Sequence, residues 1–425
     1  MKSKKINLFF FALLLGTTYI TSQTLETKVI KQVSVTYNGY TDTIDLAPIL
    51  INIDGNVVVS GNQKMNATQY DVSTAAQISN GVIVWSQSFN TSSDKAWTTA
   101  STRDGSGNIY VVGTIRTNTV NGLDYLLIKY NKWGVQQWSA TYNGPNSTTD
   151  VASAITLDGS GNIYITGASD GTLTALTDYA TIKYNSSGIQ QWVSRYNYAN
   201  SIDIATSIEY NTVSNLVLVT GSSGSTYTDW DFATIRYDES TGAQVGSASR
   251  IANVLGNAQD KTFSMASDPL GNVYIAGTSY YGTSYDMQLV KLDTSLNTVW
   301  VKNFDGHGFD DAGVNLALDS NLNIYVTGSS YINSSQTEMV VLKYNNAGTL
   351  KWKFQERSTN GSPNAEGVRV KVKSNNEIFV GGNMGNNSGQ DLALFCLDSL
   401  GHLKIKQLYN GPTGLKDKFL DMALA

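Results

Sequence analysis

A short segment that ends in glycine returns seven times along the chain, and it constrains the fold more than any other feature of the sequence. In the third copy this segment reads Ile163 to Gly167. Successive terminal glycines are separated by 52, 54, 54, 56, 51 and 54 residues; they are Gly61, Gly113, Gly167, Gly221, Gly277, Gly328 and Gly382. Self-similarity at a period of about 50 residues is typical of propellers and related repeat folds.

The third unit shows best what each repeat contains. Alternation and turn chemistry predict four strands, at residues 150–157, 163–167, 179–184 and 189–196. Short turns rich in Asn, Asp, Ser and Gly join the first pair and the last pair, and these residues tolerate the left-handed backbone of tight hairpins. No segment has a sustained 3.6-residue apolar period, so we expect almost no helix.

Four antiparallel strands per unit predict an all-β fold, a seven-bladed β-propeller of four-stranded antiparallel blades. The ends fit this count imperfectly, because one strand-like segment at 29–37 precedes the first unit and another at 417–425 follows the last. An eight-bladed propeller, truncated inside its last unit, is therefore the alternative. Pro48 marks the first unit as a degenerate copy, since proline belongs at sheet edges.

The N-terminus has the pattern of a secretory signal peptide. Three lysines precede an apolar run from Ile6 to Leu15, and a small polar stretch ends near Ser22. Such a run is too short to span a bilayer, and we expect no membrane span elsewhere. We divide the chain into a signal peptide (1–22), an N-terminal edge segment with one strand (23–43) and the propeller domain (44–425), which holds seven repeats and a C-terminal strand. We expect a secreted or cell-surface protein, with a periplasmic location as the alternative.

Charge and cysteine content exclude several function classes. Loss of residues 1–22 leaves 26 basic against 34 acidic residues, and an acidic surface argues against a nucleic-acid partner. Cys396 is the single cysteine, so no intrachain disulfide can form. His307 and His402 have no His or Cys near them in the sequence, which excludes ligand spacing of the zinc type. We expect a monomer.

The repeat resembles that of the bacterial seven-bladed β-propeller repeat (SBBP) proteins. The resemblance rests on segments such as Asp158–Gly167, Asp178–Asn185 and Gly188–Trp192, and it covers about residues 30–425. It implies an exported propeller and little about biochemistry.

Two further series recur in register. A tryptophan in strand four (Trp85, Trp138, Trp192, Trp300 and Trp352) is interpreted as packing between blades, because aromatic rings with a polar tip suit such seams. An acidic residue opens strand three, and in five of the six copies a lysine or arginine follows five residues later. This regularity suggests structural pairing between blades. The acidic residues are Asp124, Asp178, Asp231, Asp286, Glu338 and Asp391.

Another acidic residue opens the first strand in several units. First strands line the channel of a propeller, so we expect these carboxylates near its mouth, as candidate ligands for a hard cation such as calcium or for sugar hydroxyls. The alternative is a role in the fold, in which each Asp accepts backbone hydrogen bonds from an adjacent loop. The series is Asp150, Asp203, Asp260, Asp311 and Asp417, of which the first four are the candidate metal ligands. Turns such as 104–108 also resemble calcium loops faintly, although their glycines already explain them.

The longer connections are expected at one end of the blades. The turns between strands one and two and between strands three and four are short. The connections from strand two to three, at 168–177, 222–230, 278–285 and 329–337, and the connections from one blade to the next are longer and variable. Variable loops on a rigid scaffold can carry a binding site. Units four to six place aromatic residues there that other units lack, although these residues could instead cover the loop bases. The candidate binding residues are Trp230, Tyr280, Tyr281, His307, Phe309 and Tyr331, accompanied by Tyr227 and Tyr285.

These features favour a binding or scaffold module at or outside the cell surface, with a carbohydrate or a cell-surface protein as partner and adhesion as a candidate role. The alternative is a propeller enzyme, quinoprotein-like or glycan-active, with a site at the channel mouth. Quinoprotein dehydrogenases normally offer vicinal cysteines, and propeller sialidases an arginine cluster, whereas this chain has one cysteine and seven arginines. We assign no catalytic residue, because neither histidine lies in a recognisable motif.

Overall fold

The computed structural model is all β, and the part of the chain that it describes contains no helix. It follows that no described segment is a helix long and apolar enough to cross a membrane. The described residues are 14–15, 27–28, 34–37, 40–43, 46–51, 54–64, 70–78, 82–89, 95–116, 122–171, 176–226, 229–251, 259–358, 364–386, 389–410, 419 and 421–424.

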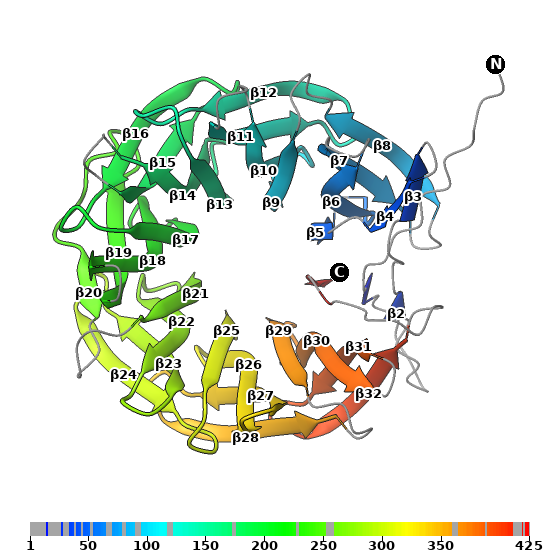
Figure 1. Cartoon of the computed structure of the whole chain (residues 1–425), viewed down its shortest axis with the longest axis vertical. Coiled ribbons are helices and arrows are strands. Elements are labelled where there is room, and N and C mark those ends of the chain that lie inside the picture. The colour runs from blue at the N-terminus through cyan, green and yellow to red at the C-terminus, as the bar shows by residue number, and fades with distance from the viewer. Residues whose placement is uncertain are drawn as a thin grey trace. The chain divides into compact units, whose positions relative to one another are not determined.

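Seven four-stranded sheets make up most of the described chain, and in each of them the strands lie in chain order (Figure 1). The first three sheets are β5 (Leu46–Ile51), β6 (Val57–Lys64), β7 (Tyr70–Gln77) and β8 (Ile83–Phe89); β9 (Ala96–Arg103), β10 (Ile109–Arg116), β11 (Leu123–Tyr130) and β12 (Gln136–Tyr142); and β13 (Asp150–Leu157), β14 (Ile163–Asp170), β15 (Thr177–Tyr184) and β16 (Gln190–Tyr196). The fourth and fifth are β17 (Asp203–Asn211), β18 (Leu216–Thr226), β19 (Asp229–Asp238) and β20 (Ser249–Ile251); and β21 (Lys261–Ser267), β22 (Val273–Tyr280), β23 (Tyr285–Leu292) and β24 (Thr298–Phe304). The last two are β25 (Asp311–Leu318), β26 (Ile324–Asn333), β27 (Gln336–Tyr344) and β28 (Leu350–Arg357); and β29 (Ala365–Val372), β30 (Ile378–Asn386), β31 (Gly389–Leu397) and β32 (Leu403–Tyr409).

Short strands lie at both ends of the chain. Where one strand was expected in residues 23–43, the structure has β2 (Thr27–Lys28) and a hairpin of β3 (Ser34–Tyr37) with β4 (Tyr40–Thr43). A small sheet joins β2 to β1 (Leu14–Leu15) and β33 (Ala423–Leu424). Asp417 lies outside the described residues.

Contacts divide the chain into two compact units. One contains residues 1–173, 184–191 and 421–425, and the other contains residues 174–183 and 192–420. Within the second unit the first strands of successive sheets contact one another, β17 with β21, β21 with β25, and β25 with β29. Within the first unit β5 contacts β9, and β9 contacts β13. Repeated four-stranded sheets packed through their first strands place the chain in the β-propeller class.

The second and third strands are longer than the sequence predicted, and in the fourth to sixth sheets the prediction of long connections between them was wrong. The β22–β23 and β26–β27 connections are residues 281–284 and 334–335, because the ladders continue past the strand-two glycine to Tyr280 and Asn333. Backbone pairing needs no particular side chain, so a polar stretch can extend a ladder. The links from sheet to sheet, such as 197–202 and 305–310, are long, as predicted. We call the end of each sheet that bears these links the loop end, and the opposite end the turn end.

The glycine that ends each strand-two motif is required by close approach of the first strand. The pairing of β25 with β26 shifts register between Gly313 and Asn315, opposite Gly328. A Cβ atom on Gly328 would lie 1.7 Å from the carbonyl oxygen of Ala312, and one on Gly113 would lie 1.8 Å from that of Trp97. Only a residue without a side chain fits beside such a bulge.

The core lies between neighbouring sheets. In β10, residues Ile109 to Ile115 are all buried, as expected for a strand covered on both faces. One buried cluster joins Tyr274 and Leu289 of the fifth sheet to Leu316, Val326 and Leu342 of the sixth. Packing of this kind between sheets is the main source of burial in the described chain.

Candidate functional site

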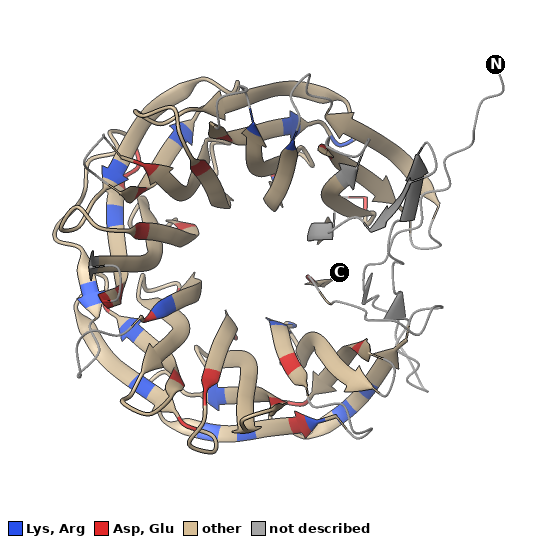
Figure 2. Ribbon diagram, in the orientation of Figure 1, with Lys and Arg blue, Asp and Glu red and all other residues tan. Residues whose placement is uncertain are grey.

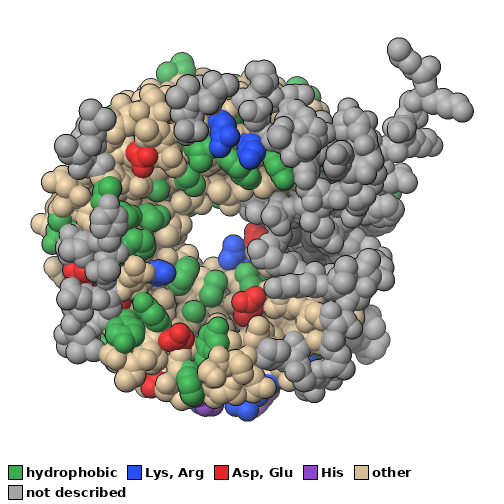
Figure 3. Space-filling view, in the orientation of Figure 1, with side chains coloured by type: hydrophobic (Ala, Val, Ile, Leu, Met, Phe, Trp, Pro, Cys, Tyr) green, Lys and Arg blue, Asp and Glu red, His purple; other side chains and the backbone are tan. Residues whose placement is uncertain are grey.

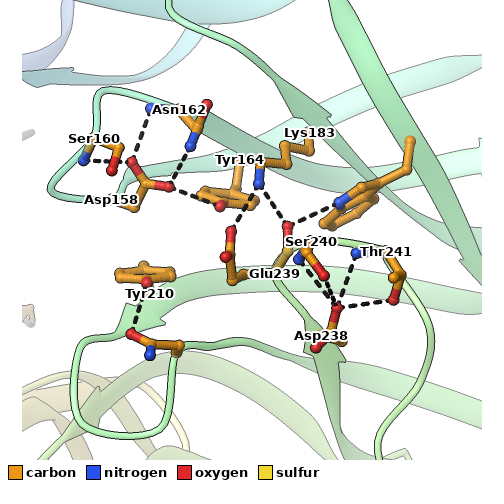
Figure 4. A network of polar contacts seen from close by, with 12 residues as sticks. Asp158, Ser160, Asn162, Tyr164, Lys183, Tyr210, Asp238, Glu239, Ser240 and Thr241 are labelled. Carbon is orange, nitrogen blue, oxygen red and sulfur yellow. Dashed lines mark hydrogen bonds and ion pairs between the residues drawn. The ribbon is translucent and has the colours of Figure 1, made fainter.

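The strand-four tryptophans lie in the seams between sheets, as predicted. Trp300 Nε1 donates a hydrogen bond of 3.2 Å to the carbonyl oxygen of Asn346 in the next sheet, and Lys291 contacts the same residue. Figure 4 shows the same arrangement in the second unit, where Lys183 Nζ lies 2.6 Å from the carbonyl oxygen of Glu239 and 2.8 Å from its carboxylate. Each lysine and tryptophan thus holds the turn of the following sheet, which is a structural role.

The aspartates of the first turns are fully used inside those turns. Asp158 Oδ1 accepts the backbone N–H groups of Ser160 and Asn162, and Oδ2 accepts the Asn162 amide and the Tyr164 hydroxyl (Figure 4). Asp104, Asp268 and Asp319 repeat this pattern. Turn geometry therefore explains the motif that resembles a calcium loop.

A cavity of about 700 Å³ lies at the turn end of the first unit. It is lined by residues of two first turns, with Asp104 and Asp158 among them, and by Arg103, Tyr110 and Lys129. Lys129 Nζ donates to the carbonyl oxygen of Ser186 at 3.0 Å, and both carboxylates are bonded as above. Asp104, Asp158 and Lys129 in this cavity thus already serve the fold.

The first-strand aspartates each hold a neighbouring backbone segment. Asp150, Asp203 and Asp311 accept the N–H groups of Gly144, Tyr198 and Gly306 at 2.7, 2.8 and 2.7 Å. Asp260 accepts the N–H of Tyr280 at 3.2 Å. These contacts support the role in the fold that we considered for this series. Asp311 is the one member of the four that lies in a described group of three acidic residues.

Burial dominates the electrostatics of these aspartates. It raises the pKa of Asp203, Asp260 and Asp311 to about 6. Two smaller effects act on each of these pKa values. A hydrogen bond from a serine on the paired strand lowers it, and the negative charge of the nearest strand-three carboxylate raises it. For Asp311 the serine is Ser330 and the carboxylate is that of Asp286.

Three of the strand-three acids pair with an arginine of their own sheet, and not with the basic residue five positions later. Asp178 binds Arg195 at 2.7 Å, Asp231 binds Arg250 at 2.6 Å, and Glu338 binds Arg357 at 2.8 Å. The predicted pairing between blades thus holds for the lysines, which reach the next sheet, while the acids pair within a sheet. The physical reason is strand geometry, since the fourth strand lies directly beside the third.

Asp286 departs from this rule. The pairing of β23 with β24 ends at Met287 and Phe304, so the neighbouring residues Asp286 and Asp305 lie opposite each other just beyond it. In the next sheet the equivalent positions are Glu338 and Arg357. Asp286, Asp305 and Asp311 each offer a carboxylate oxygen within 4.8 Å of the others. Burial, followed by the charge of Asp305, raises the pKa of Asp286. From the sequence, Asp311 was a candidate ligand and Asp286 a candidate for structural pairing between blades. Asp305 was not predicted, because no repeat position marks a residue in a variable link.

Aromatic residues lie on the same strands and link as these three acids. The rings of Tyr280 and Tyr285 meet edge to face at 5.2 Å between centroids. Asp310 accepts the N–H of Tyr285 through its carboxylate and the N–H of Tyr331 through its carbonyl oxygen, both at 2.9 Å. Phe309 and Tyr331 are 41% and 38% exposed. We call Tyr280, Tyr285, Asp286, Asp305, Phe309, Asp310, Asp311 and Tyr331 the loop-end patch.

The loop-end patch belongs to the fifth and sixth sheets, in the second unit. Acidic positions, red in Figure 2, gather around the start of β25. The space-filling view shows hydrophobic side chains, green, beside acidic ones, red, over these two sheets (Figure 3).

The other candidate binding residues lie outside the loop-end patch or are held within the sheets. Trp230 lies within β19, where its carbonyl oxygen accepts the N–H of Asp260 at 2.8 Å, and its indole Nε1 is buried without a hydrogen-bond partner. The Tyr281 hydroxyl accepts a hydrogen bond from Gln288 at 3.1 Å, and His307 Nε2 lies 2.8 Å from the buried carboxylate of Glu338. Trp230, Tyr280, Tyr285 and Tyr331 lie in strands, so their predicted place in loops was wrong for the reason given above. Tyr227 lies outside the described residues.

Comparison with known proteins does not assign the chain to a family. No protein-family model matches the chain, and no curated protein matches it. Among solved structures, the polysaccharide lyase Uly1 is 11% identical over 95% of this chain and 97% of its own, with a TM-score of 0.49. Sqt1 from Chaetomium thermophilum, bound to the N-terminus of ribosomal protein L10, is 12% identical over 85% and 86%, with a TM-score of 0.46. A protein of unknown function from Dyadobacter fermentans is 8% identical over 85% and 93%, with a TM-score of 0.44. The class assignment rests on the repeated sheets of the chain itself.

Proposed function

We propose that this chain is an exported, seven-bladed β-propeller that works as a binding or scaffold module at or outside the cell surface. Seven four-stranded sheets support the blade count. The charged and apolar pattern of residues 1–22 supports export, and the resemblance to the SBBP repeat agrees with both.

The observation that carries the proposal is the exposure of aromatic rings beside carboxylates in the loop-end patch. Phe309 and Tyr331 expose about two-fifths of their surface, at 41% and 38%, and Asp310 joins the two segments that bear them. Aromatic faces can stack on sugar rings or anchor a protein partner. Exposed carboxylates beside them can accept hydrogen bonds from sugar hydroxyls. We therefore propose a carbohydrate as the ligand, with a cell-surface protein as the second candidate.

A glycan array probed with residues 23–425 tests this proposal. We expect a defined set of glycans to bind, and we expect Phe309→Ala and Tyr331→Ala to lower binding at least tenfold while the melting temperature changes little. Trp133→Ala is the matched control, because Trp133 is 67% exposed at the turn end of its sheet. Equal loss in the control, or unchanged binding in both patch variants, would contradict the proposal. If the array is blank and a cell-surface protein is captured in a manner that depends on Phe309, the second candidate replaces the first.

A further inference from the structure

We propose that the cavity at the turn end of the second and third sheets binds a sugar acid, whose carboxylate is held by Arg103 and Lys129. The cavity lies within the first unit, whereas the loop-end patch belongs to the second, so this site goes beyond the proposed function. Its volume of about 700 Å³ falls in the range of about 300–1,000 Å³ that is usual for small-molecule sites.

Arg103 departs from the repeat. It ends the first strand of its sheet and pairs with Ile109, the first residue of the strand-two motif. Among the seven sheets, arginine is the only charged residue at this position. The other sheets have Ile51, Leu157, Tyr210, Ser267, Leu318 and Val372 there. The fold therefore does not require a charge at this position.

The Arg103 guanidinium is available to a ligand. Arg103 is exposed and lines the cavity, and within the described part of the chain it forms no ion pair and no hydrogen bond. By contrast, Arg195 and Arg250 each bind an acid of their own sheet. A guanidinium presents its N–H donors in a planar fork that matches the two oxygens of a carboxylate.

Lys129 supplies a second cation, and it has no carboxylate partner among the described residues. Its Nζ donates to the carbonyl oxygen of Ser186, as does the strand-four tryptophan of its sheet. In the next sheet Lys183 and the corresponding tryptophan donate to the carbonyl oxygen of Glu239, so Ser186 and Glu239 occupy equivalent positions. Glu239 also forms an ion pair of 2.8 Å with Lys183 (Figure 4). A serine cannot, and the carboxylate of a ligand would supply the missing partner of Lys129.

The rest of the lining suits a hydrophilic ligand. Leu157 is the only aliphatic residue in it, so an apolar acid would find little surface to contact. Ser106 and Ser160 are exposed, and their backbone N–H groups bind the turn aspartates, which leaves both hydroxyls for a ligand. Hydroxyls both donate and accept hydrogen bonds, as the hydroxyls of a sugar do. These observations favour a carboxylate carried by a sugar.

The two turn aspartates in the lining limit the affinity. Each accepts four hydrogen bonds from its own turn, so neither Asp104 nor Asp158 has a free position for a cation. Their negative charges nevertheless offset part of the attraction that Arg103 and Lys129 exert on an anion. We therefore expect a weak site, with a dissociation constant on the order of 1 mM.

Calorimetric titration of the protein with glucuronate tests the site. We expect binding that is about tenfold or more weaker for glucose, which lacks the carboxylate, and for acetate, which lacks the sugar ring. Added salt should weaken the binding of glucuronate, because the charges that bind it are exposed to solvent. Absence of glucuronate binding, or equal affinity for glucose, would overturn the proposal. Equal affinity for acetate would overturn the assignment to a sugar acid.

Two variants identify the binding groups. Arg103→Ala should weaken glucuronate binding by about tenfold or more and leave the melting temperature nearly unchanged, because the side chain has no partner to lose. Ser186→Glu, which copies the Glu239 arrangement, should pair with Lys129 and weaken binding to a similar extent. Lys132→Ala is the matched control, since it removes a positive charge from the turn end of the same sheet, outside the cavity. Unchanged binding in Arg103→Ala, or equal loss in Lys132→Ala, would overturn the proposal.

Phe309→Ala separates this site from the loop-end patch. Glucuronate binding should persist in this variant, because Phe309 does not line the cavity. Loss of binding in Phe309→Ala together with its retention in Arg103→Ala would place the sugar at the loop-end patch and overturn the proposal. A blank glycan array would count against the proposed function alone, since the calorimetric test depends on Arg103 and not on Phe309.

Discussion

Asp286 and Asp305 face each other at the end of the β23–β24 pair, where the following sheet places Glu338 opposite Arg357. Like charges directly across a strand pair are destabilising, whereas opposite charges stabilise. The same repeat position thus carries an ion pair in one sheet and a charge conflict in the next. This difference distinguishes the fifth sheet from the sixth.

The strand-two glycines should be among the least replaceable residues. Gly328→Ala is expected to lower the free energy of unfolding by about 3 kcal/mol or more, because the new Cβ would meet the Ala312 carbonyl oxygen 1.7 Å away. Denaturant unfolding measures the change. Gly105→Ala is the control, since nothing lies within 4 Å of its Cβ position. Similar losses in the two variants would contradict the close-approach explanation.

The tryptophan seam can be separated into packing and hydrogen bonding. Trp300→Phe keeps a ring against Tyr274 but removes the N–H that binds the Asn346 carbonyl oxygen, so we expect a loss of about 1 kcal/mol in unfolding free energy. The exposed Trp133 provides the comparison, because its replacement by phenylalanine should change stability little. If Trp300→Phe is as stable as the wild type, the indole N–H has no structural role.

The buried first-strand aspartates should make stability depend on pH. Burial raises the pKa of Asp203 to about 6 in the folded state, above its ordinary value of 3.8. Between these two pH values the folded chain binds more protons than the unfolded chain. The contribution of Asp203 to the free energy of unfolding therefore falls as pH rises and is lost above about pH 6. The asparagine of Asp203→Asn has no titratable group, so this pH dependence is absent from the variant. Its amide oxygen can still accept the Tyr198 N–H.

Unfolding curves at several pH values measure this effect. The stability of Asp203→Asn relative to the wild type should increase by on the order of 2 kcal/mol from pH 4 to pH 7. Asp260→Asn should behave in the same way, because burial also raises the pKa of Asp260 to about 6. Parallel stability profiles for wild type and variants would show that these carboxyls titrate normally.

Local patterns in the sequence determined much of this protein. Alternation with a period of two placed the strands of the third unit, and β13 has the predicted bounds of 150–157. The seam tryptophans and the Asp158 turn were also predictable, since the turn depends on contacts within a few residues and the seam repeats in register.

Tertiary structure alone decided which charges meet. Asp286, Asp305 and Asp311 belong to a third strand, a link and the next first strand, and their distances depend on cross-strand register and on how one sheet packs against the next. Likewise, Tyr280 and Tyr331 lie in strands because a ladder of backbone hydrogen bonds continues through polar residues that look like loop in the sequence. Side-chain periodicity is a local signal, whereas the pairing of distant carboxylates depends on the folded backbone that brings them together.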